Sequence, residues 1–317
     1  MTKNNHRNLH LSSRQISSRI MMIRPGHFAY NAETAVNNAF QQAINDQQHN
    51  VREKALAEFD EAVRLLRENE IEVIVFEDDQ NKISPDAVFP NNWITTHEDG
   101  TIITYPMYSA LRRNERREDI IETLTSQFRV DRRYSLETLE EENIYLEGTG
   151  SMVLDRDKKI VYACLSPRTD VTVLNKFSLL MNYHTEFFHA TDEDGVPIYH
   201  TNVMMAIGVD FAVVCLESID SSTRDHVNRL LEKSGKAVVE ISLQQMRRFA
   251  GNMLQLRTAN GDPVLVMSQT AKESLSPEQY LFLHEKTRIL EINIPVIEQV
   301  GGGSVRCMMA EIFLPTK

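Results

Sequence analysis

The stretch NVMMAIGVDFAVVCL, residues 202–216, consists of two short apolar runs separated by Gly208-Val209-Asp210. Apolar runs that are bounded by turn residues predict a β-hairpin. The next segment, SSTRDHVNRLLEKSG at 221–235, begins with N-cap candidates, has apolar positions at helical spacing and ends in glycine, so it predicts a helix with one buried face. AVVEISL, at 237–243, predicts a further strand. The stretch therefore forms one ββαβ unit.

The same order of elements occurs three more times. The hairpins are NWITTHEDGTIITYPM from Asn92, GSMVLDRDKKIVYACL from Gly150 and NMLQLRTANGDPVLVMS from Asn252. Together with the hairpin from Asn202, their starts are separated by 58, 52 and 50 residues. Two of the turns contain Asp-Gly or Asn-Gly, which are strong hairpin signals. Helical segments follow at 112–128, 171–181 and 276–287. Similar units at a nearly constant spacing indicate a repeat architecture.

A fifth unit can be assembled from the two ends of the chain. Its parts are the strand MMIRPGHFAY (21–30), the helix around ALAEFDEAVRLLREN (55–69), the strand IEVIVF (71–76) and a C-terminal strand at 304–314. We therefore expect a single-domain α/β fold, a five-bladed pseudo-symmetric α/β propeller of ββαβ modules whose strand starts surround one central channel. An open α/β sheet would satisfy the same elements. We expect a polar N-terminal arm at 1–18 and the propeller domain at 19–317.

The composition argues against several classes of protein. A formal net charge of −11 argues against a nucleic-acid surface, which needs a basic stripe, and the mixed run RRNERR at 112–117 does not change this. No stretch approaches the roughly 20 apolar residues that span a bilayer. Three cysteines at no metal-like spacing indicate a reducing compartment, so we expect a cytoplasmic protein. The Arg- and Ser-containing N-terminus leaves a transit peptide as an alternative.

Three polar residues lie at equivalent positions of different modules. Cys307 follows three glycines, while His200 and Glu147 each directly precede a hairpin. If the modules form a propeller, the thiol, the imidazole and the carboxylate meet at one channel, where they can act as nucleophile, general acid/base and orienting group. Each residue also has a structural alternative, since a free cysteine is usually a small buried hydrophobe. Cys164 and Cys215 lie inside apolar strands, and we expect both in the core.

This set resembles the guanidine-modifying, or pentein, superfamily, which includes arginine deiminase, dimethylarginine dimethylaminohydrolase and glycine amidinotransferase. The likeness covers residues 20–317 and follows the family's order. An acidic residue and glycine lie at Glu147-Gly148, a histidine at His200, and a Gly-Gly segment leads to Cys307. The resemblance implies an enzyme in which Cys307 is the nucleophile, His200 the general acid/base and Glu147 the residue that orients His200.

Two further segments are similar to parts of this superfamily. PDAVF, at 85–89, resembles a run of the dimethylarginine hydrolases, and SPRT, at 166–169, resembles the Ser-x-Arg-Thr of the deiminases. By this likeness Arg168, and also Arg112 or Arg113, would bind the α-carboxylate of a substrate, which a planar guanidinium pairs bidentately. For Arg112 and Arg113, a surface ion pair is the alternative.

Asn92 and Asn202 stand where relatives that act on guanidinium groups carry carboxylates. A carboxylate suits a cationic guanidinium, whereas a carboxamide both donates and accepts hydrogen bonds and so suits a neutral ureido group. FPNNW, at 89–93, also resembles the bacterial citrulline-utilisation hydrolases of the superfamily. We therefore expect a ureido substrate such as citrulline, with Asp86 placed to bind its amino group. Capping of turns or strand ends is the alternative for the two asparagines.

The resemblance implies a covalent mechanism. A Cys307 thiolate, stabilised by a neighbouring His200 imidazolium, would attack the ureido carbon, and His200 would then protonate the leaving amine and activate water. We expect no metal or organic cofactor, a small amino-acid substrate, and no nucleic-acid or membrane partner, and leave a homo-oligomer open. The alternatives are an arginine deiminase, dimethylarginine hydrolase or amidinotransferase, and a non-enzymatic propeller that binds a macromolecule.

Overall fold

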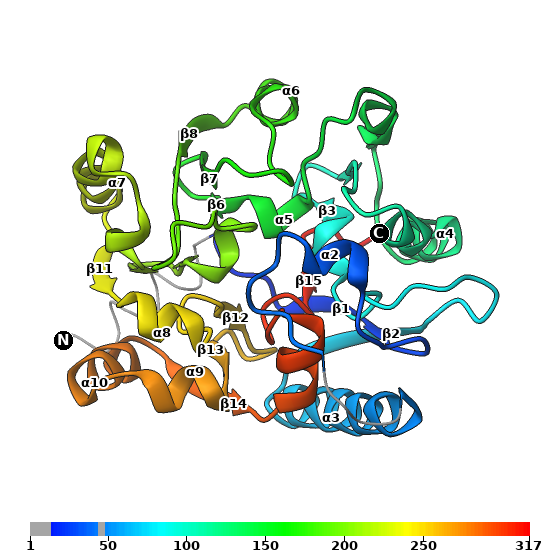
Figure 1. Ribbon diagram of the computed structural model, residues 1–317. Helices are drawn as coiled ribbons and strands as arrows, with labels where there is room; N and C mark the ends of the chain where they lie inside the picture. The colour runs from blue at the N-terminus through cyan, green and yellow to red at the C-terminus, as the bar shows by residue number, and fades with distance from the viewer. Residues whose placement is uncertain (1–13, 44–47) are drawn as a thin grey trace.

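The computed structural model describes residues 14–43 and 48–317, and these residues form five separate three-stranded sheets (Figure 1). Four sheets come from continuous stretches, and in each an antiparallel hairpin is followed by a helix and a third strand that runs parallel to the second. In order they contain β3 (Ile94–Thr96), β4 (Thr101–Thr104) and β5 (Arg132–Ser135); β6 (Val153–Asp155), β7 (Ile160–Cys164) and β8 (His184–Phe188); β9 (Met205–Ile207), β10 (Phe211–Val214) and β11 (Ala237–Glu240); and β12 (Leu254–Arg257), β13 (Pro263–Ser268) and β14 (Arg288–Ile292). These are the four ββαβ units that the sequence predicts.

The fifth sheet joins segments from the two ends of the chain. β1 (Arg19–Arg24) pairs antiparallel with β15 (Ala310–Glu311) and parallel with β2 (Glu72–Glu77). The predicted shared module is therefore confirmed, and the alternative of one open sheet is wrong. β15 is shorter than the predicted C-terminal strand, because turns such as the one closed by the Cys307 N–H and the Ser304 carbonyl, at 2.9 Å, precede it.

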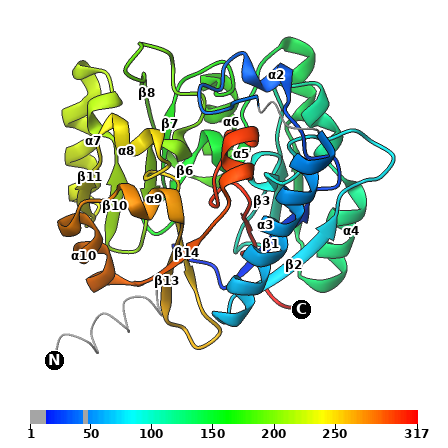
Figure 2. The same cartoon turned by 60° about the horizontal axis from the view of Figure 1, so that its bottom comes forward.

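A long helix connects the second and third strands of each continuous sheet, and another connects β1 with β2. These helices are α3 (Gln48–Glu68), α4 (Glu118–Gln127), α6 (Val171–Met181), α7 (Ser221–Lys233) and α10 (Pro277–Lys286), and they lie around the periphery in Figure 1. Figure 2 shows α3 across β1 and β2. The Asp170 and Asp220 side chains cap α6 and α7 by accepting backbone hydrogen bonds from Thr172 and Ser222.

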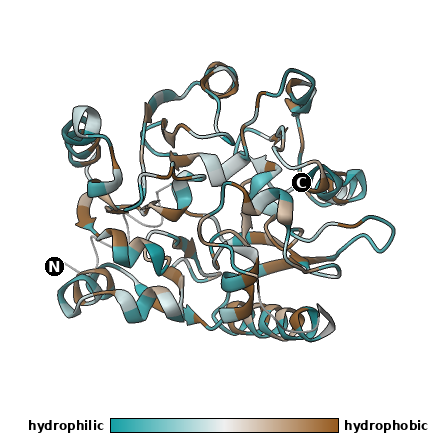
Figure 3. Ribbon diagram, viewed as in Figure 1, coloured by the Kyte–Doolittle hydropathy of each residue, from teal (hydrophilic) through white to brown (hydrophobic). Residues whose placement is uncertain are grey.

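The core lies between the sheets and the inner faces of the helices. Figure 3 shows hydrophobic residues concentrated in the strands, while the peripheral helices carry many hydrophilic residues. Within α6, Leu174 and Phe177 are fully buried, whereas Leu179 is 85% exposed. Cys164 and Cys215 are also fully buried, which confirms their predicted place in the core.

The predicted N-terminal arm is described only from residue 14 onward, and residues 1–13 lie outside the described residues. The Gln15 side chain is buried and donates hydrogen bonds to the carbonyls of Leu154 and Ile207, at 2.9 and 3.2 Å. This part of the arm therefore packs on two of the sheets, and the domain boundary at residue 18 stays a prediction. None of the described helices has the length and apolar character needed to cross a membrane.

We predict that Leu174→Ala lowers the free energy of unfolding by about 2–5 kcal/mol, because the substitution leaves a cavity in the core. Leu179→Ala is the same change in the same helix at an exposed position, and it should alter the free energy of unfolding by no more than about 0.5 kcal/mol. Urea unfolding followed by circular dichroism measures both values. Equal losses in the two variants would contradict the described packing of α6.

Candidate active site

Short helical turns directly precede the first strands of three modules. They are η1 (Pro90–Asn92), α5 (Gly148–Ser151) and η4 (Thr201–Val203). The strands therefore begin slightly later than the sequence pattern predicts. The turns are tightly packed, since a Cβ atom on Gly150 would lie 2.3 Å from Asn92 Nδ2 and 2.7 Å from His200 Nδ1. Glycine at this position lets two neighbouring modules bring their side chains against α5.

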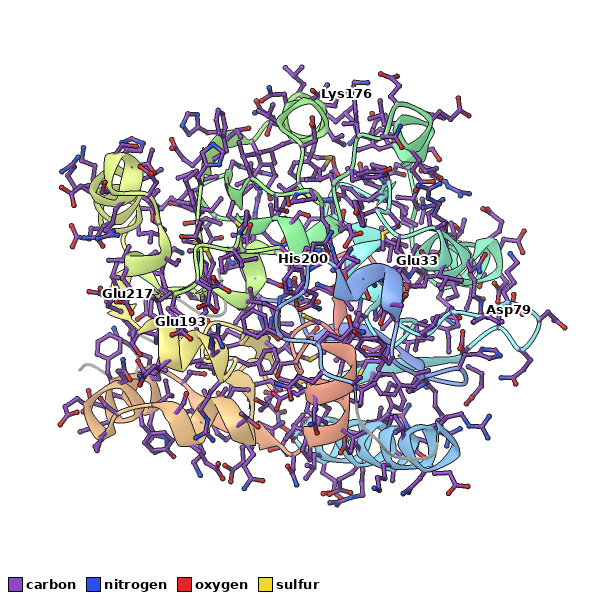
Figure 4. The ribbon with its side chains drawn as sticks, in the orientation of Figure 1. Glu33, Asp79, Lys176, Glu193, His200 and Glu217 are labelled. Carbon is purple, nitrogen blue, oxygen red and sulfur yellow. The ribbon has the colours of Figure 1, made fainter. Side chains whose placement is uncertain are left out.

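Most of the predicted site residues converge on one cavity beside these turns. The cavity is narrow and is lined by Thr34, Asn38, Asp86, Phe89, Asn92, Arg112, Arg168, Tyr199, His200, Gly301, Gly302, Gly303 and Cys307. His200 lies near the middle of the molecule, next to the short helix α2 (Ala32–Ala35) that carries Glu33 (Figure 4). Across the described ranges, no group of three or more His, Cys, Asp or Glu side chains is placed to hold a metal ion.

His200 and Glu147 form a buried hydrogen-bonded pair, with His200 Nε2 2.8 Å from Glu147 Oε2. Burial lowers the pKa of His200 to about 4, although the Glu147 carboxylate opposes this shift. Burial also disfavours charge on Glu147, but Arg168, His200 and Arg112 outweigh it and hold the pKa of this carboxyl group well below its usual value. Burial therefore favours a neutral His200 imidazole, and the neighbouring cations favour an ionised Glu147 carboxylate.

The predicted pair of a His200 imidazolium and a Cys307 thiolate stays a prediction. Burial disfavours a charge on His200, whereas its hydrogen bond to the Glu147 carboxylate favours one. The hydrogen-bond donors to the Cys307 sulfur are two carboxamides, Asn202 Nδ2 at 3.4 Å and Asn252 Nδ2 at 3.3 Å. The thiol therefore rests against neutral N–H donors.

Asn252 is not among the predicted site residues. The repeat could have pointed to it, because Asn252 begins the fourth module in the same way as Asn92 and Asn202 begin two others. An asparagine that recurs at one repeat position could have been assigned to the site on that ground.

The orientation of the Asn92 side chain is fixed by Arg112. Arg112 Nη1 lies 2.8 Å from Asn92 Oδ1, and since a guanidinium only donates hydrogen bonds, the amide oxygen has to face it. The NH₂ group of Asn92 therefore points away from Arg112. In the part of the chain that the structure describes, Asn92 Nδ2, Asn202 Oδ1 and Asp86 Oδ1 are buried without a hydrogen-bond partner. Buried polar atoms are normally paired, and Asn92 and Asp86 line the cavity, so their two atoms are available to a ligand there.

Arg112 and Arg113 are both held by carboxylates of the protein. Arg112 lines the cavity but makes a bidentate ion pair with Glu115, at 2.7 and 2.9 Å. Burial raises the pKa of Glu115 to about 7, against the influence of Arg112. Arg113 is the next residue of the turn η2 (Leu111–Glu115) and points elsewhere, to Glu140 at 3.2 Å. The expectation that Arg113 binds a substrate is corrected, because the turn directs it away from the cavity.

Arg168 lines the cavity and is held by the segment that follows α2. Its Nε and Nη2 atoms lie 2.8 and 2.5 Å from Asn37 Oδ1, and Nη2 also donates to the Thr34 carbonyl at 2.8 Å. The guanidinium carbon lies 4.9 Å from the centre of the Tyr199 ring. One amide oxygen thus occupies the fork of Arg168 that would suit a carboxylate.

Five ββαβ sheets and a buried thiol, imidazole and carboxylate are the features of the guanidine-modifying, or pentein, superfamily of enzymes. The chain belongs to the family described as N,N dimethylarginine dimethylhydrolase, eukaryotic, whose model matches residues 24–314. This membership confirms the superfamily that the sequence resembles. A comparison with curated proteins gave no match.

Similar solved structures include an arginine dihydrolase and a dimethylarginine hydrolase. ArgZ, an arginine dihydrolase from the ornithine-ammonia cycle in cyanobacteria, has a TM-score of 0.72 and 16% identity in its apo form, over 94% of this chain and 41% of ArgZ. Its substrate-bound N-terminal domain has a TM-score of 0.71 and 16% identity, over 93% of this chain and 99% of the domain. A dimethylarginine dimethylaminohydrolase adduct with S-methyl-L-thiocitrulline has a TM-score of 0.62 and 13% identity, over 93% of this chain and 99% of that one. This chain therefore spans less than half of ArgZ, and the likeness is one of fold.

We predict that the His200 imidazole stays neutral from about pH 8 down to about pH 5, because its pKa is lowered by burial. Glu147→Gln removes a charge that favours the imidazolium and should lower the titration midpoint further. NMR of histidine-labelled protein, with the resonance assigned from His200→Asn, follows the titration. Glu141→Gln changes an exposed carboxylate nearby in the sequence and should leave the midpoint unchanged. A midpoint at or above the ordinary 6.5 would favour the imidazolium–thiolate pair instead.

Proposed function

We propose that this chain is a cysteine hydrolase that cleaves a C–N bond of a ureido amino acid, with citrulline and water giving ornithine, ammonia and carbon dioxide. The observation that carries the proposal is the orientation of Asn92, whose NH₂ group is turned away from Arg112 and lacks a partner among the described residues. A ureido oxygen can accept a hydrogen bond from this group. A guanidinium would instead face it with further N–H donors.

The other available atoms suit the remaining parts of citrulline. Asn202 Oδ1 can accept a hydrogen bond from a ureido N–H, and Asp86 Oδ1 can accept one from the α-ammonium group. Burial raises the pKa of Asp86, with Arg112 opposing the shift, so an ammonium partner would favour the charged carboxylate. The Arg168 fork would bind the α-carboxylate in place of the Asn37 amide oxygen.

The reaction begins when neutral His200 accepts the proton of the Cys307 thiol. The thiolate attacks the ureido carbon, and the imidazolium, stabilised by Glu147, returns the proton to the leaving nitrogen as the C–N bond breaks. Water then attacks the S-carbamoyl carbon, His200 accepts a proton from the water, and the C–S bond breaks with return of that proton to sulfur. The carbamic acid that leaves decomposes to an amine and carbon dioxide.

A second candidate is hydrolysis of a guanidino group. It is favoured by the family, which is named for dimethylarginine, and by the similar fold of an arginine dihydrolase. The buried carboxylates of Asp86, Glu115 and Glu147 would also suit a cation. The products separate the candidates. Citrulline yields equal amounts of ammonia and ornithine, arginine dihydrolysis yields twice as much ammonia as ornithine, and dimethylarginine hydrolysis yields dimethylamine.

We also infer that the five sheets close into a propeller and that the protein acts in the cytoplasm. Contacts of β15 with β3, of β6 with β9 and of β9 with β12 support the closed arrangement. The three cysteines are free thiols, which supports a reducing compartment.

We predict that the wild-type protein releases ornithine and ammonia from citrulline, and that Cys307→Ser lowers turnover about a thousandfold or more, since a hydroxyl is a much weaker nucleophile than a thiolate. Amino-acid analysis and an ammonia assay on citrulline, arginine and dimethylarginine measure the products. Cys215→Ala, at a buried cysteine of the core, is the control and should retain turnover.

Turnover of arginine without turnover of citrulline would select the second candidate. Folded protein inactive on all three substrates would favour a non-enzymatic propeller.

We predict that Asn92→Asp lowers kcat/KM for citrulline about a hundredfold, because a donor to the ureido oxygen is replaced by a carboxylate oxygen that repels it. The ratio of arginine to citrulline turnover should rise. Asn91→Asp changes the adjacent buried asparagine, whose Nδ2 faces Thr149 Oγ1 at 3.4 Å, and should leave this ratio unchanged. An unaltered ratio in Asn92→Asp would contradict the ureido assignment.

A further inference from the structure

The Cys307 sulfur is in contact with carboxamides from two modules. We infer that Asn252 is a further catalytic residue, which together with Asn202 donates hydrogen bonds to this sulfur and stabilises the thiolate. The inference rests on the proposed function in one respect, namely that Cys307 is the nucleophile. It adds a residue outside the predicted site, and it adds hydrogen bonds that stabilise the thiolate beside the imidazolium that the proposed reaction forms.

The orientation of the Asn252 amide is fixed by a neighbouring carbonyl. Asn252 Nδ2 lies 2.8 Å from the backbone oxygen of Asn202 and 3.3 Å from Cys307 Sγ. A carbonyl oxygen only accepts hydrogen bonds, so the NH₂ group of Asn252, and not its oxygen, has to face Asn202. One N–H of this group is thereby directed to the carbonyl, and the other is available to the sulfur.

The fold brings Asn252 to this position through a strained turn. Phe249 has a φ of 62°, in the left-handed region that is unusual for a bulky residue, and its carbonyl accepts a hydrogen bond from Asn252 N at 2.8 Å. The turn is pressed against the third module, because a Cβ atom on Gly251 would lie 2.4 Å from the Val203 carbonyl oxygen. Asn252 is fully buried as a result. Backbone strain of this kind is commonly found at functional sites.

The two amides contact the Cys307 sulfur directly. The adjacent Arg306 is directed to the Met309 carbonyl at 3.1 Å and to Glu311 at 3.4 Å. A buried anion without donors is strongly unfavourable, and hydrogen bonds to charged groups are stronger than neutral ones. Asn252 also suits the protonated thiol, since its Oδ1 lies 3.7 Å from Sγ and can accept the S–H.

The test measures the rate at which iodoacetamide alkylates Cys307 near neutral pH, read by peptide mass spectrometry. Burial raises the pKa of Cys164 to about 12 and that of Cys215 to about 11, so both remain thiols and serve as internal references. Asn252→Ala should slow alkylation roughly three- to tenfold, because loss of a donor lowers the thiolate fraction while the remaining thiolate becomes somewhat more nucleophilic.

Asn252→Asp keeps the shape of the side chain. It therefore tests the inference even if Asn252→Ala leaves a cavity or fails to fold. It replaces the donor with a negative charge and should slow alkylation more than Asn252→Ala does. Asn92→Ala is the matched control, since Asn92 lines the cavity at the equivalent repeat position and donates to no sulfur. It should lower turnover and leave the alkylation rate unchanged.

Wild-type alkylation rates in folded Asn252→Asp would overturn the inference, even if Cys307→Ser still abolishes turnover and the proposed function stands. Normal turnover by Cys307→Ser would overturn the proposed function itself, whatever the alkylation rates are. Because alkylation requires no substrate, the two failures are distinguishable. Circular dichroism of each variant confirms that the compared proteins are folded.

Discussion

The buried carboxylate of Glu147 is the group on which the site depends. An ionised carboxylate away from water is unfavourable unless it is paired, and Glu147 lies 2.8 Å from His200 and 3.5 Å from both Arg112 and Arg168. Each partner has a second task. Arg112 orients Asn92, Arg168 donates to the Thr34 carbonyl of α2, and His200 lines the cavity. One buried carboxylate therefore holds side chains from several modules in fixed positions around the cavity.

The repeat supplies equivalent positions, and the neighbours of each position decide its chemistry. Asn92, Asn202 and Asn252 begin three modules in the same way. The first accepts a hydrogen bond from Arg112, whereas the other two donate to the sulfur of Cys307. A scaffold of similar units thus carries an asymmetric site, which is why the fold alone does not identify the substrate.

The signals that predict the modules are local ones, namely turn dipeptides and apolar spacing, and so the sheets and helices agree with the sequence. The placement of Cys307 and His200 in one cavity could be predicted because both lie at repeat-equivalent positions. The effect of burial on His200 could not, since it depends on the packing and on side-chain partners. Arg112 and Arg113 are adjacent in the sequence, and only the direction of their turn separates a cavity residue from one outside it. Asn252 reaches the sulfur through a left-handed turn at Phe249, a residue that gives no turn signal.

The pairing of β1 with β15 joins two segments that leave the ribosome at different times. Residues 310–311 complete a sheet whose other two strands, 19–24 and 72–77, are synthesised much earlier. A nascent chain forms its N-terminal parts first, so Glu147 and His200 leave the ribosome well before Cys307 does. An unfinished chain that ends before residue 307 lacks the thiol that lines the cavity. Cys307 therefore follows the other cavity-lining residues in the chain, and it joins them where β15 pairs with β1.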